Sequence, residues 1–182
     1  MKSRFLLMVV CLLLALPACV SVAPNDDPAL IKLYEQGKSA YDNYEYEDAL
    51  RALEPAALGG HPDAQYYLAI LYDFGRGVAM DHEKAVEWYL KAARQEQDDA
   101  QYNLAISYLE GEGVAQDDQQ AMYWMTRSAE NGDSDAQRVL GLFYMEEELV
   151  AQDLEKARYW LQKSAAQGDT RAVSILRELD SY

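Results

Sequence analysis

Histidine and serine are the side chains in this sequence that could support nucleophilic or metal-assisted chemistry. The only histidines are His61 and His82, and no cysteine lies near either of them, so a zinc site is not expected. We expect both histidines to lie on the surface or in loops. The few serines fall on expected helix faces or at helix caps, which leaves no Ser-His-Asp set. Carboxylates are plentiful, but most of them fall on expected solvent faces. The sequence therefore predicts a non-enzymatic protein without metal or cofactor.

The three tryptophans are a second candidate for chemistry, because a row of aromatic rings can stack on sugar rings. Trp88, Trp124 and Trp160 follow one another at a constant spacing of 36 residues. Each falls on the same helical face as a set of small residues that includes alanines. This phase favours a place in the core over a glycan-binding ladder.

Cys19 is a candidate for lipid attachment. It follows an almost wholly apolar run, residues 5–16, which has two basic residues before it and is too short to cross a bilayer comfortably. The end of this run, Leu16-Pro17-Ala18-Cys19, resembles a bacterial lipobox, although proline is an unusual residue at its position. The resemblance implies a signal peptide, residues 1–18, and a lipidated tether, residues 19–28. The alternatives are an ordinary secretory signal and an uncleaved anchor.

Val20, the residue after the cysteine, concerns the destination of such a lipoprotein. In the sorting pattern that the sequence resembles, an aspartate there favours the inner membrane. Its absence implies a lipid anchor in the outer membrane of the cell envelope, with the protein facing the periplasm.

The chain is strongly acidic. After removal of residues 1–18, 14 Lys and Arg face 31 Asp and Glu, a net charge of −17. Such a surface repels nucleic acid and anionic lipid headgroups. It could favour a basic protein partner, but acidity also keeps an exported protein soluble. Nucleic acid is therefore not expected as a partner.

From Asp63 onward the chain repeats itself every 36 residues without insertions. Asp63-Ala64-Gln65 returns at residues 99–101 and again at 135–137. Repeats of this length are typical of solenoids built from supersecondary units. Apolar residues at helical spacing predict two helices in each unit. The first helix ends at a glycine turn, formed in two units by Gly75 with Gly77 and Gly111 with Gly113.

Caps for these helices can also be proposed from the sequence. Asp81, Asp117 and Asp153 stand where the second helices should begin, so we expect them to act as N-caps. Asp98 and Ser134 look like caps of the following first helices, each paired with a glutamine three residues later.

These residues resemble the Sel1-like repeat, a relative of the tetratricopeptide repeat. The resemblance covers three units, residues 63–98, 99–134 and 135–170. Residues 29–62 match the spacing of a tetratricopeptide-like unit, and residues 171–182 repeat only a first helix, which is expected to be a C-terminal capping helix. The resemblance implies an all-α fold, a right-handed α-solenoid of helix-turn-helix repeats.

In tetratricopeptide relatives, partners bind the concave face formed by the first helices. By this analogy the candidate partner-binding residues share three positions of the repeat, with Ile70, Ile106 and Leu142 equally suited to packing. The candidates are Tyr66, Asp73, Tyr102, Leu109, Arg138 and Met145.

The third unit departs from the pattern, since Glu147 and Leu149 replace its turn glycines. Either the turn is built differently or the helix runs on, and the acidic corner Glu146 to Glu148 could meet a basic partner or be a tolerated degeneration. The resemblance implies a non-catalytic scaffold or adaptor that binds protein partners in the cell envelope. The alternatives are a cell-wall-active hydrolase and a glycan- or peptidoglycan-binding module.

Overall fold

The computed structural model describes residues 26–146 and 149–180, and this part of the chain contains nine α-helices and no strand. The predicted all-α class is therefore confirmed. The predicted signal segment, Cys19 and residues 20–25 of the predicted tether lie outside the described residues. The helices are α1 (Pro28–Asp42), α2 (Tyr46–Leu58), α3 (Pro62–Asp73), α4 (His82–Ala93), α5 (Asp98–Glu110), α6 (Asp118–Asn131), α7 (Ser134–Glu146), α8 (Leu154–Ala166) and α9 (Thr170–Leu179).

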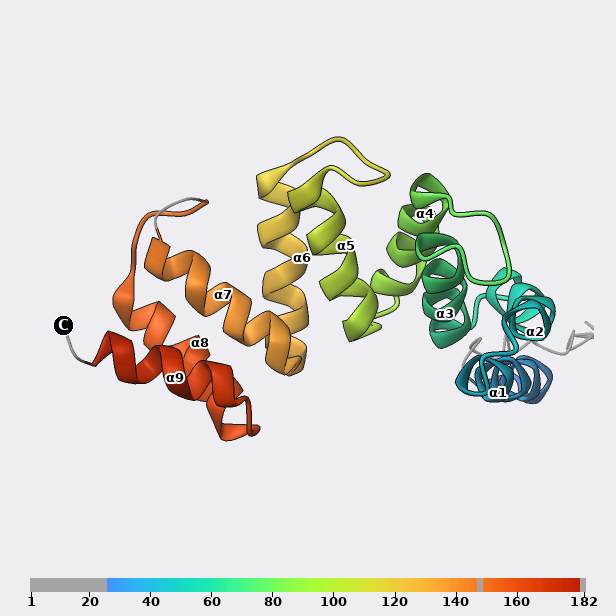
Figure 1. The fold of residues 1–182 in the computed structure, drawn as a ribbon, viewed down its shortest axis with the longest axis horizontal. Coiled ribbons are helices and arrows are strands. Elements are labelled where there is room, and N and C mark those ends of the chain that lie inside the picture. Colours follow the sequence, from blue (N-terminus) through green and yellow to red (C-terminus); the bar gives the residue numbers. More distant parts are fainter. Residues whose placement is uncertain (1–25, 147–148, 181–182) are drawn as a thin grey trace, which may run out of the picture.

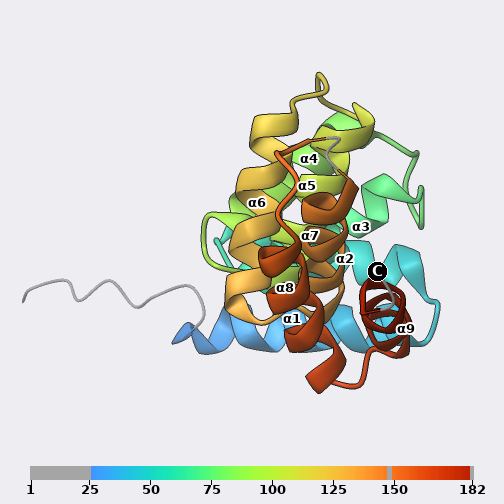
Figure 2. The ribbon, with the colours of Figure 1, turned by 90° about the vertical axis from the view of Figure 1, so that its left-hand side faces the viewer.

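The helices form four hairpin pairs, α1 with α2, α3 with α4, α5 with α6 and α7 with α8, and α9 follows alone. Each second helix packs on the next first helix, so the pairs follow one another along an arc (Figure 1). Seen from the α9 end, they stack behind one another (Figure 2). This arrangement is the predicted α-solenoid. No described helix is both long and apolar enough to cross a membrane.

Small residues let the helices of successive pairs approach closely, and leucines fill the space between them. Ala100, Ala121 and Ala136 are completely buried, as are Leu104 and, almost completely, Leu140. Most of the central core is one continuous cluster that runs from α3 to α7. The molecule therefore has a long core rather than a round one, as expected of stacked repeats.

The predicted N-caps of the second helices are confirmed. The carboxylates of Asp81, Asp117 and Asp153 accept hydrogen bonds from backbone N–H groups in the first turns of α4, α6 and α8. The predicted caps of the next first helices, Asp98 and Ser134, are wrong.

The residues immediately before them act as caps instead. Gln97 Oε1 accepts from the N–H of Ala100 at 2.6 Å, and Asp133 Oδ1 accepts from the N–H of Ala136 at 2.6 Å. Both α5 and α7 thus begin one residue earlier than expected, at Asp98 and Ser134, because Gln97 and Asp133 supply the side-chain acceptor of the cap.

The glutamine of the Asp-Ala-Gln motif joins three helices. In each case Nε2 donates to the carbonyl eight residues earlier, at the end of the preceding second helix: Gln65 to Ala57 (3.1 Å), Gln101 to Ala93 (3.1 Å) and Gln137 to Ala129 (3.0 Å). Each Oε1 accepts from an amide at the end of its own pair, from Gln95, Asn131 and Gln167. Since a buried amide must be paired, this position specifies the stacking of the repeats.

The second glycine of each turn allows a close contact between neighbouring pairs. Gly77 and Gly113 both have a φ of +69°. A Cβ added to Gly113 would lie 2.1 Å from the carbonyl oxygen of His82, and one added to Gly77 would lie 2.6 Å from that of Tyr46. Each turn therefore rests on the start of the second helix of the preceding pair.

Leu149 stands at this position in the third unit, where a side chain could not make the same approach. Helix α7 is described as far as Glu146, which is the repeat equivalent of Glu110 at the end of α5, and Leu149 itself is not helical. The loop returns to the same place, because the N–H of Asp153 donates to the carbonyl of Tyr144 at 2.8 Å. Glu147 and Glu148 lie outside the described residues.

Candidate functional site

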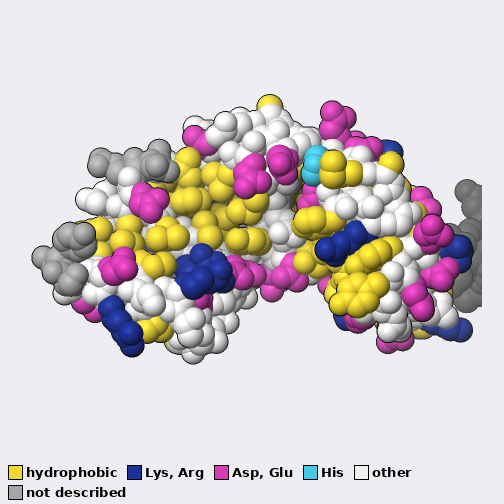
Figure 3. Space-filling view, viewed as in Figure 1, with side chains coloured by type: hydrophobic (Ala, Val, Ile, Leu, Met, Phe, Trp, Pro, Cys, Tyr) yellow, Lys and Arg dark blue, Asp and Glu magenta, His cyan; other side chains and the backbone are white. Residues whose placement is uncertain are grey.

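The side of the stack formed by α3, α5 and α7, which we call the first-helix face, carries apolar side chains that are not fully covered. Figure 3 shows a hydrophobic surface over α5 and α7, with acidic side chains and a histidine beside it. An apolar surface that crosses two repeats is a common feature of protein-binding sites. The partly exposed apolar residues on these two helices are Tyr102, Ile106, Tyr108, Leu109, Val139, Leu142, Phe143, Tyr144 and Met145.

Tyr66 and Tyr102, two of the predicted partner-binding residues, lie half-buried on this face. Tyr66 packs against Tyr67 and Tyr89, with ring centroids 5.3 and 6.2 Å apart. Burial raises the pKa of both the Tyr66 and the Tyr102 hydroxyl, with nearby carboxylates adding to the effect. Both rings pack against the central core and remain partly exposed.

Asp73, a third predicted binding residue, is engaged within the protein. Its Oδ1 lies 2.8 Å from Nδ1 of His82, and its Oδ2 accepts from the Tyr89 hydroxyl at 3.1 Å. The carboxylate therefore holds the start of α4 to the end of α3, and it is available to a partner only through its remaining acceptor capacity.

Arg138 is also held internally. Its Nε donates to Oδ2 of Asp169 at 2.7 Å, and its NH2 group donates to Oδ1 of Asp135 at 2.5 Å, while its side chain is only 12% exposed. A guanidinium held by two carboxylates is not a free anchor, so its structure favours a role in joining α7 to the start of α9.

Leu109 and Met145 occupy the same repeat position as Asp73. Leu109 packs against the main core cluster, whereas Met145 packs against the small cluster of Leu161, Ala172 and Leu179 beneath α9. Both remain partly exposed, so they extend the apolar surface toward the C-terminal end of the stack.

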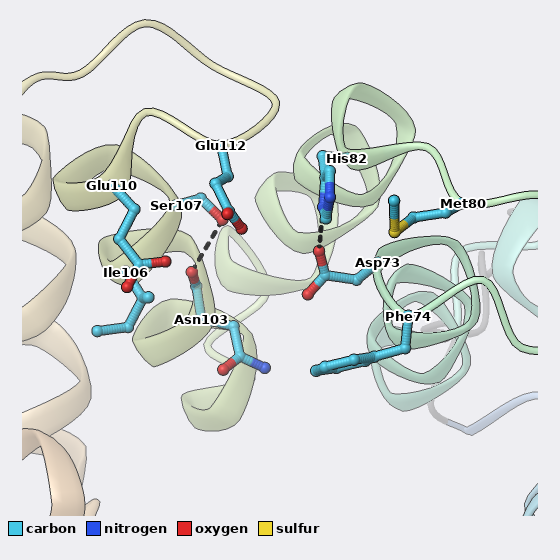
Figure 4. A pocket seen from close by; sticks show the side chains of 9 residues that line it. All are labelled: Asp73, Phe74, Met80, His82, Asn103, Ile106, Ser107, Glu110 and Glu112. Carbon is cyan, nitrogen blue, oxygen red and sulfur yellow. Dashed lines mark hydrogen bonds and ion pairs between the residues drawn. The ribbon is translucent and has the colours of Figure 1, made fainter.

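A pocket of about 410 Å³ opens between α3 and α5, at the edge of the apolar surface. Figure 4 shows that residues from α3 and the start of α4 face residues from α5 and the following turn across it. Apolar and acidic side chains share its walls, and no lysine or arginine lines it. The lining residues are Asp73, Phe74, Met80, His82, Asn103, Ile106, Ser107, Glu110 and Glu112.

The electrostatics of this pocket are negative. The hydrogen bond with Asp73 raises the pKa of His82, and the charges of Asp73, Glu112 and Asp81 add to this effect. An imidazole near three carboxylates therefore holds its proton more readily than a free histidine. Sequence reasoning missed this histidine as a site residue, since its only signal was its place at the start of a second helix.

Among the described residues that line the pocket, no hydroxyl or thiol is hydrogen-bonded to His82 as an activated nucleophile would be. The Ser107 hydroxyl donates to the carbonyl of Asn103 in its own helix, at 3.1 Å, rather than to His82. Within the described residues, no group of three or more His, Cys, Asp and Glu side chains is arranged to hold a metal ion. The arrangement is suited to holding a cation or a polar group by hydrogen bonds.

His61 lies in the loop before α3, one of the two expected positions, but it is not on the surface, since it is only 4% exposed. Its Nδ1 accepts from the N–H of Ala64 at 3.4 Å, so it caps α3, and its ring stacks on Tyr34 with centroids 4.6 Å apart. Burial lowers the pKa of His61, although Asp63 acts in the opposite direction. The neutral ring is favoured because a protonated Nδ1 could not accept this bond.

The tryptophans lie on the second helices, away from the first-helix face. Trp124 is buried, and its indole N–H has no partner among the described residues. Trp88 and Trp160 are partly buried against the core, and the Lys91 ammonium lies 3.7 Å from the centre of the Trp88 ring. A stacked glycan could not reach the Trp124 ring without displacing its neighbours.

A protein-family model matches the three repeats that are seen in the structure. The model of the Sel1 repeat matches residues 62–96, 98–133 and 134–169. No curated protein matches the chain.

Several solved structures are similar to this chain. One is a protective antigen of uropathogenic Escherichia coli with an SLR fold, which is 33% identical with a TM-score of 0.76, over 81% of this chain and 32% of the antigen. Another is a Sel1 repeat protein from Oxalobacter formigenes, 33% identical with a TM-score of 0.73, over 77% of this chain and 56% of that protein. The chain thus spans about a third and just over half of these two proteins.

The Helicobacter pylori cysteine-rich protein B is more distant. It is 21% identical with a TM-score of 0.50, over 66% of this chain and 98% of that protein. At this identity the similarity shows only a shared fold.

Proposed function

Because the chain belongs to the Sel1 repeat family, whose members commonly mediate protein–protein interactions, we propose that it is a non-catalytic scaffold that binds a protein partner through its first-helix face. The observation that carries this proposal is the apolar surface over α5 and α7 (Figure 3). Its residues are held on a rigid stack, so little conformational entropy is lost when a partner binds them.

We further propose that this scaffold is a lipoprotein of the cell envelope, anchored through Cys19 in the outer membrane and facing the periplasm. The support is the apolar run of residues 5–16 followed by Leu16-Pro17-Ala18-Cys19. Several acyl chains would hold the protein at the membrane, each gaining about 0.8 kcal/mol per buried methylene. The short segment before α1 would then keep the binding face near the bilayer.

The test is site-specific photocrosslinking in cells of the full chain. A photoreactive residue placed at Leu142 on the first-helix face should give a discrete crosslinked protein. The same residue placed at Tyr123, which is 50% exposed on α6, is the matched control and should not. A Leu142→Glu change, with the photoreactive residue moved to Ile106, should remove the product, because a charge is not tolerated in an apolar contact.

A second arm separates the anchor from the binding face. Cys19→Ser should move the protein from the membrane fraction to the soluble fraction. Equal crosslinking from Leu142 and Tyr123 would contradict binding at the first-helix face. Unchanged processing and membrane association of Cys19→Ser would contradict lipidation, and turnover or saturable binding of cell-wall fragments would replace the scaffold by a hydrolase or a glycan-binding module.

A further inference from the structure

The pocket between α3 and α5 is lined by residues that the next repeat does not share. Ser107 and Asn103 line it from α5, and the residues 36 positions later, Phe143 and Val139, are larger or wholly apolar. Phe143 and Val139 pack against the central core. A small side chain at residue 107 thus leaves open a space that the next repeat can fill with a ring.

The carboxylates at the rim of this pocket are not neutralised by the protein. Within the described part of the chain, neither Glu110 nor Glu112 forms an ion pair, and both are exposed. The third carboxylate, Asp73, has the imidazole of His82 as its one ionic partner among the described residues. A cation entering here would meet acceptors on both sides of the opening (Figure 4).

Arg76, which lies against a lining residue, does not neutralise this rim. The Arg76 guanidinium lies 4.9 Å from the centre of the Phe74 ring, but it donates to the Tyr41 hydroxyl on α1 and does not line the pocket. The pocket is therefore left with a negative rim in a protein that carries an excess of acidic residues.

Beside the polar side chains of Asn103 and Ser107, the pocket has apolar walls that are partly accessible. Phe74 and Met80 are 61% and 63% exposed, and Ile106 continues the apolar surface of α5. A long basic side chain fits such a pocket, because its aliphatic stem can pack on apolar groups while its charged end forms hydrogen bonds with carboxylates.

We propose that this pocket binds an arginine or lysine side chain of the protein partner, with the stem against Met80 and Ile106 and the charged end at Glu110 and Glu112. The inference rests on the proposed function, since it names the part of the partner that the first-helix face recognises. Charge complementarity selects a basic segment, and the adjoining apolar surface selects apolar residues beside the basic one.

The test is an NMR titration of the full chain in detergent solution with two short peptides, acetyl-Leu-Arg-Leu-amide and acetyl-Leu-Gln-Leu-amide. The arginine peptide should produce saturable shifts at Met80, Asn103 and Ile106, with an affinity at least about fivefold above that of the glutamine peptide. Equal affinities would overturn the proposal, as would shifts spread over the whole acidic surface.

Two variants and a control sharpen this test. Ser107→Phe introduces the residue of the next repeat and should abolish the saturable shifts, with an unchanged melting temperature showing that the fold is kept. Glu110→Gln, on an exposed side chain, should weaken binding about threefold without any effect on folding. Glu130→Gln, an equally exposed change on α6, should leave binding unchanged. Full affinity in both Ser107→Phe and Glu110→Gln would overturn the proposal.

The outcome can be told apart from failure of the proposed function. If Leu142 crosslinks to a partner but the arginine peptide does not bind, the scaffold remains and the pocket assignment falls. If the peptide binds but Leu142 gives no crosslink, the pocket binds basic side chains but the scaffold proposal is lost.

Discussion

His61 and His82 stand in environments that act on the proton in opposite directions. His61 is buried, and this burial lowers its pKa, while its Nδ1 accepts a backbone hydrogen bond. His82 is bonded to the Asp73 carboxylate, which raises its pKa. Neither environment follows from a lone histidine in a sequence, because each depends on a neighbour supplied by the hairpin packing.

The two histidines should therefore change stability with opposite signs. A lowered folded-state pKa means that the contribution of His61 is present above its unfolded pKa, about 6.5, and is lost as the pH falls through its folded pKa. A raised pKa means that the contribution of His82 is present below about 6.5 and is lost as the pH rises through its folded pKa.

Urea unfolding of the wild type and two variants between pH 5 and 8 checks this prediction. His61→Asn keeps an acceptor for the cap but does not titrate, so it should reduce the loss of stability on acidification. His82→Gln should instead reduce the loss on going from neutral to higher pH. Identical pH profiles for all three proteins would contradict it.

At the scale of elements, the repeats are joined by a glycine turn on one side and a buried glutamine on the other. Gly113 can make its close contact because it has no side chain, since a Cβ would lie 2.1 Å from the carbonyl oxygen of His82. Gly132, with a φ of +113°, has nothing within 4 Å of the same added atom. The two positions separate backbone strain from steric overlap.

Gly113→Ala should destabilise the protein by about 2–4 kcal/mol, since it adds overlap to strain, whereas Gly132→Ala should cost about 1–2 kcal/mol from strain alone. Chemical denaturation of both variants measures the difference. Equal losses of unfolding free energy in the two variants would contradict this prediction. They would show that the turn containing Gly113 can shift away from α4 to make room for the added Cβ.

The sequence predicts the elements well where their cause is local. The period of 36 residues, the aspartate N-caps of the second helices and the all-α fold are each encoded within a few turns of chain. The caps at Gln97 and Asp133 were missed because a glutamine and an aspartate compete there with equally suitable neighbours. The site was harder still, because the pocket depends on Ser107 being small opposite the end of α3.

At the scale of the whole molecule, each pair of helices contacts mainly the pairs next to it, so stability should be nearly one-dimensional. Helix α9 covers the last pair. Leu161 on α8 is completely buried, and it packs with Ala172 and Leu179 of α9 in a cluster separate from the central core. The loss of α9 should therefore destabilise the neighbouring pair, α7 and α8, and have little effect on the stability of the other pairs.

Removal of residues 170–182 should lower the opening free energy of α7 and α8 by about 2–4 kcal/mol, because it exposes Leu161 and leaves part of its contacts unfilled. Hydrogen exchange followed by mass spectrometry should show this loss in α7 and α8 while α3 to α6 keep most of their protection. Leu179→Ala, which keeps the helix but trims the contact, should give the same pattern to a smaller extent. A uniform loss from α3 to α8 would mean that the buried glutamines couple the pairs into one cooperative unit, because each of them bonds both to the end of the preceding pair and to the end of its own pair.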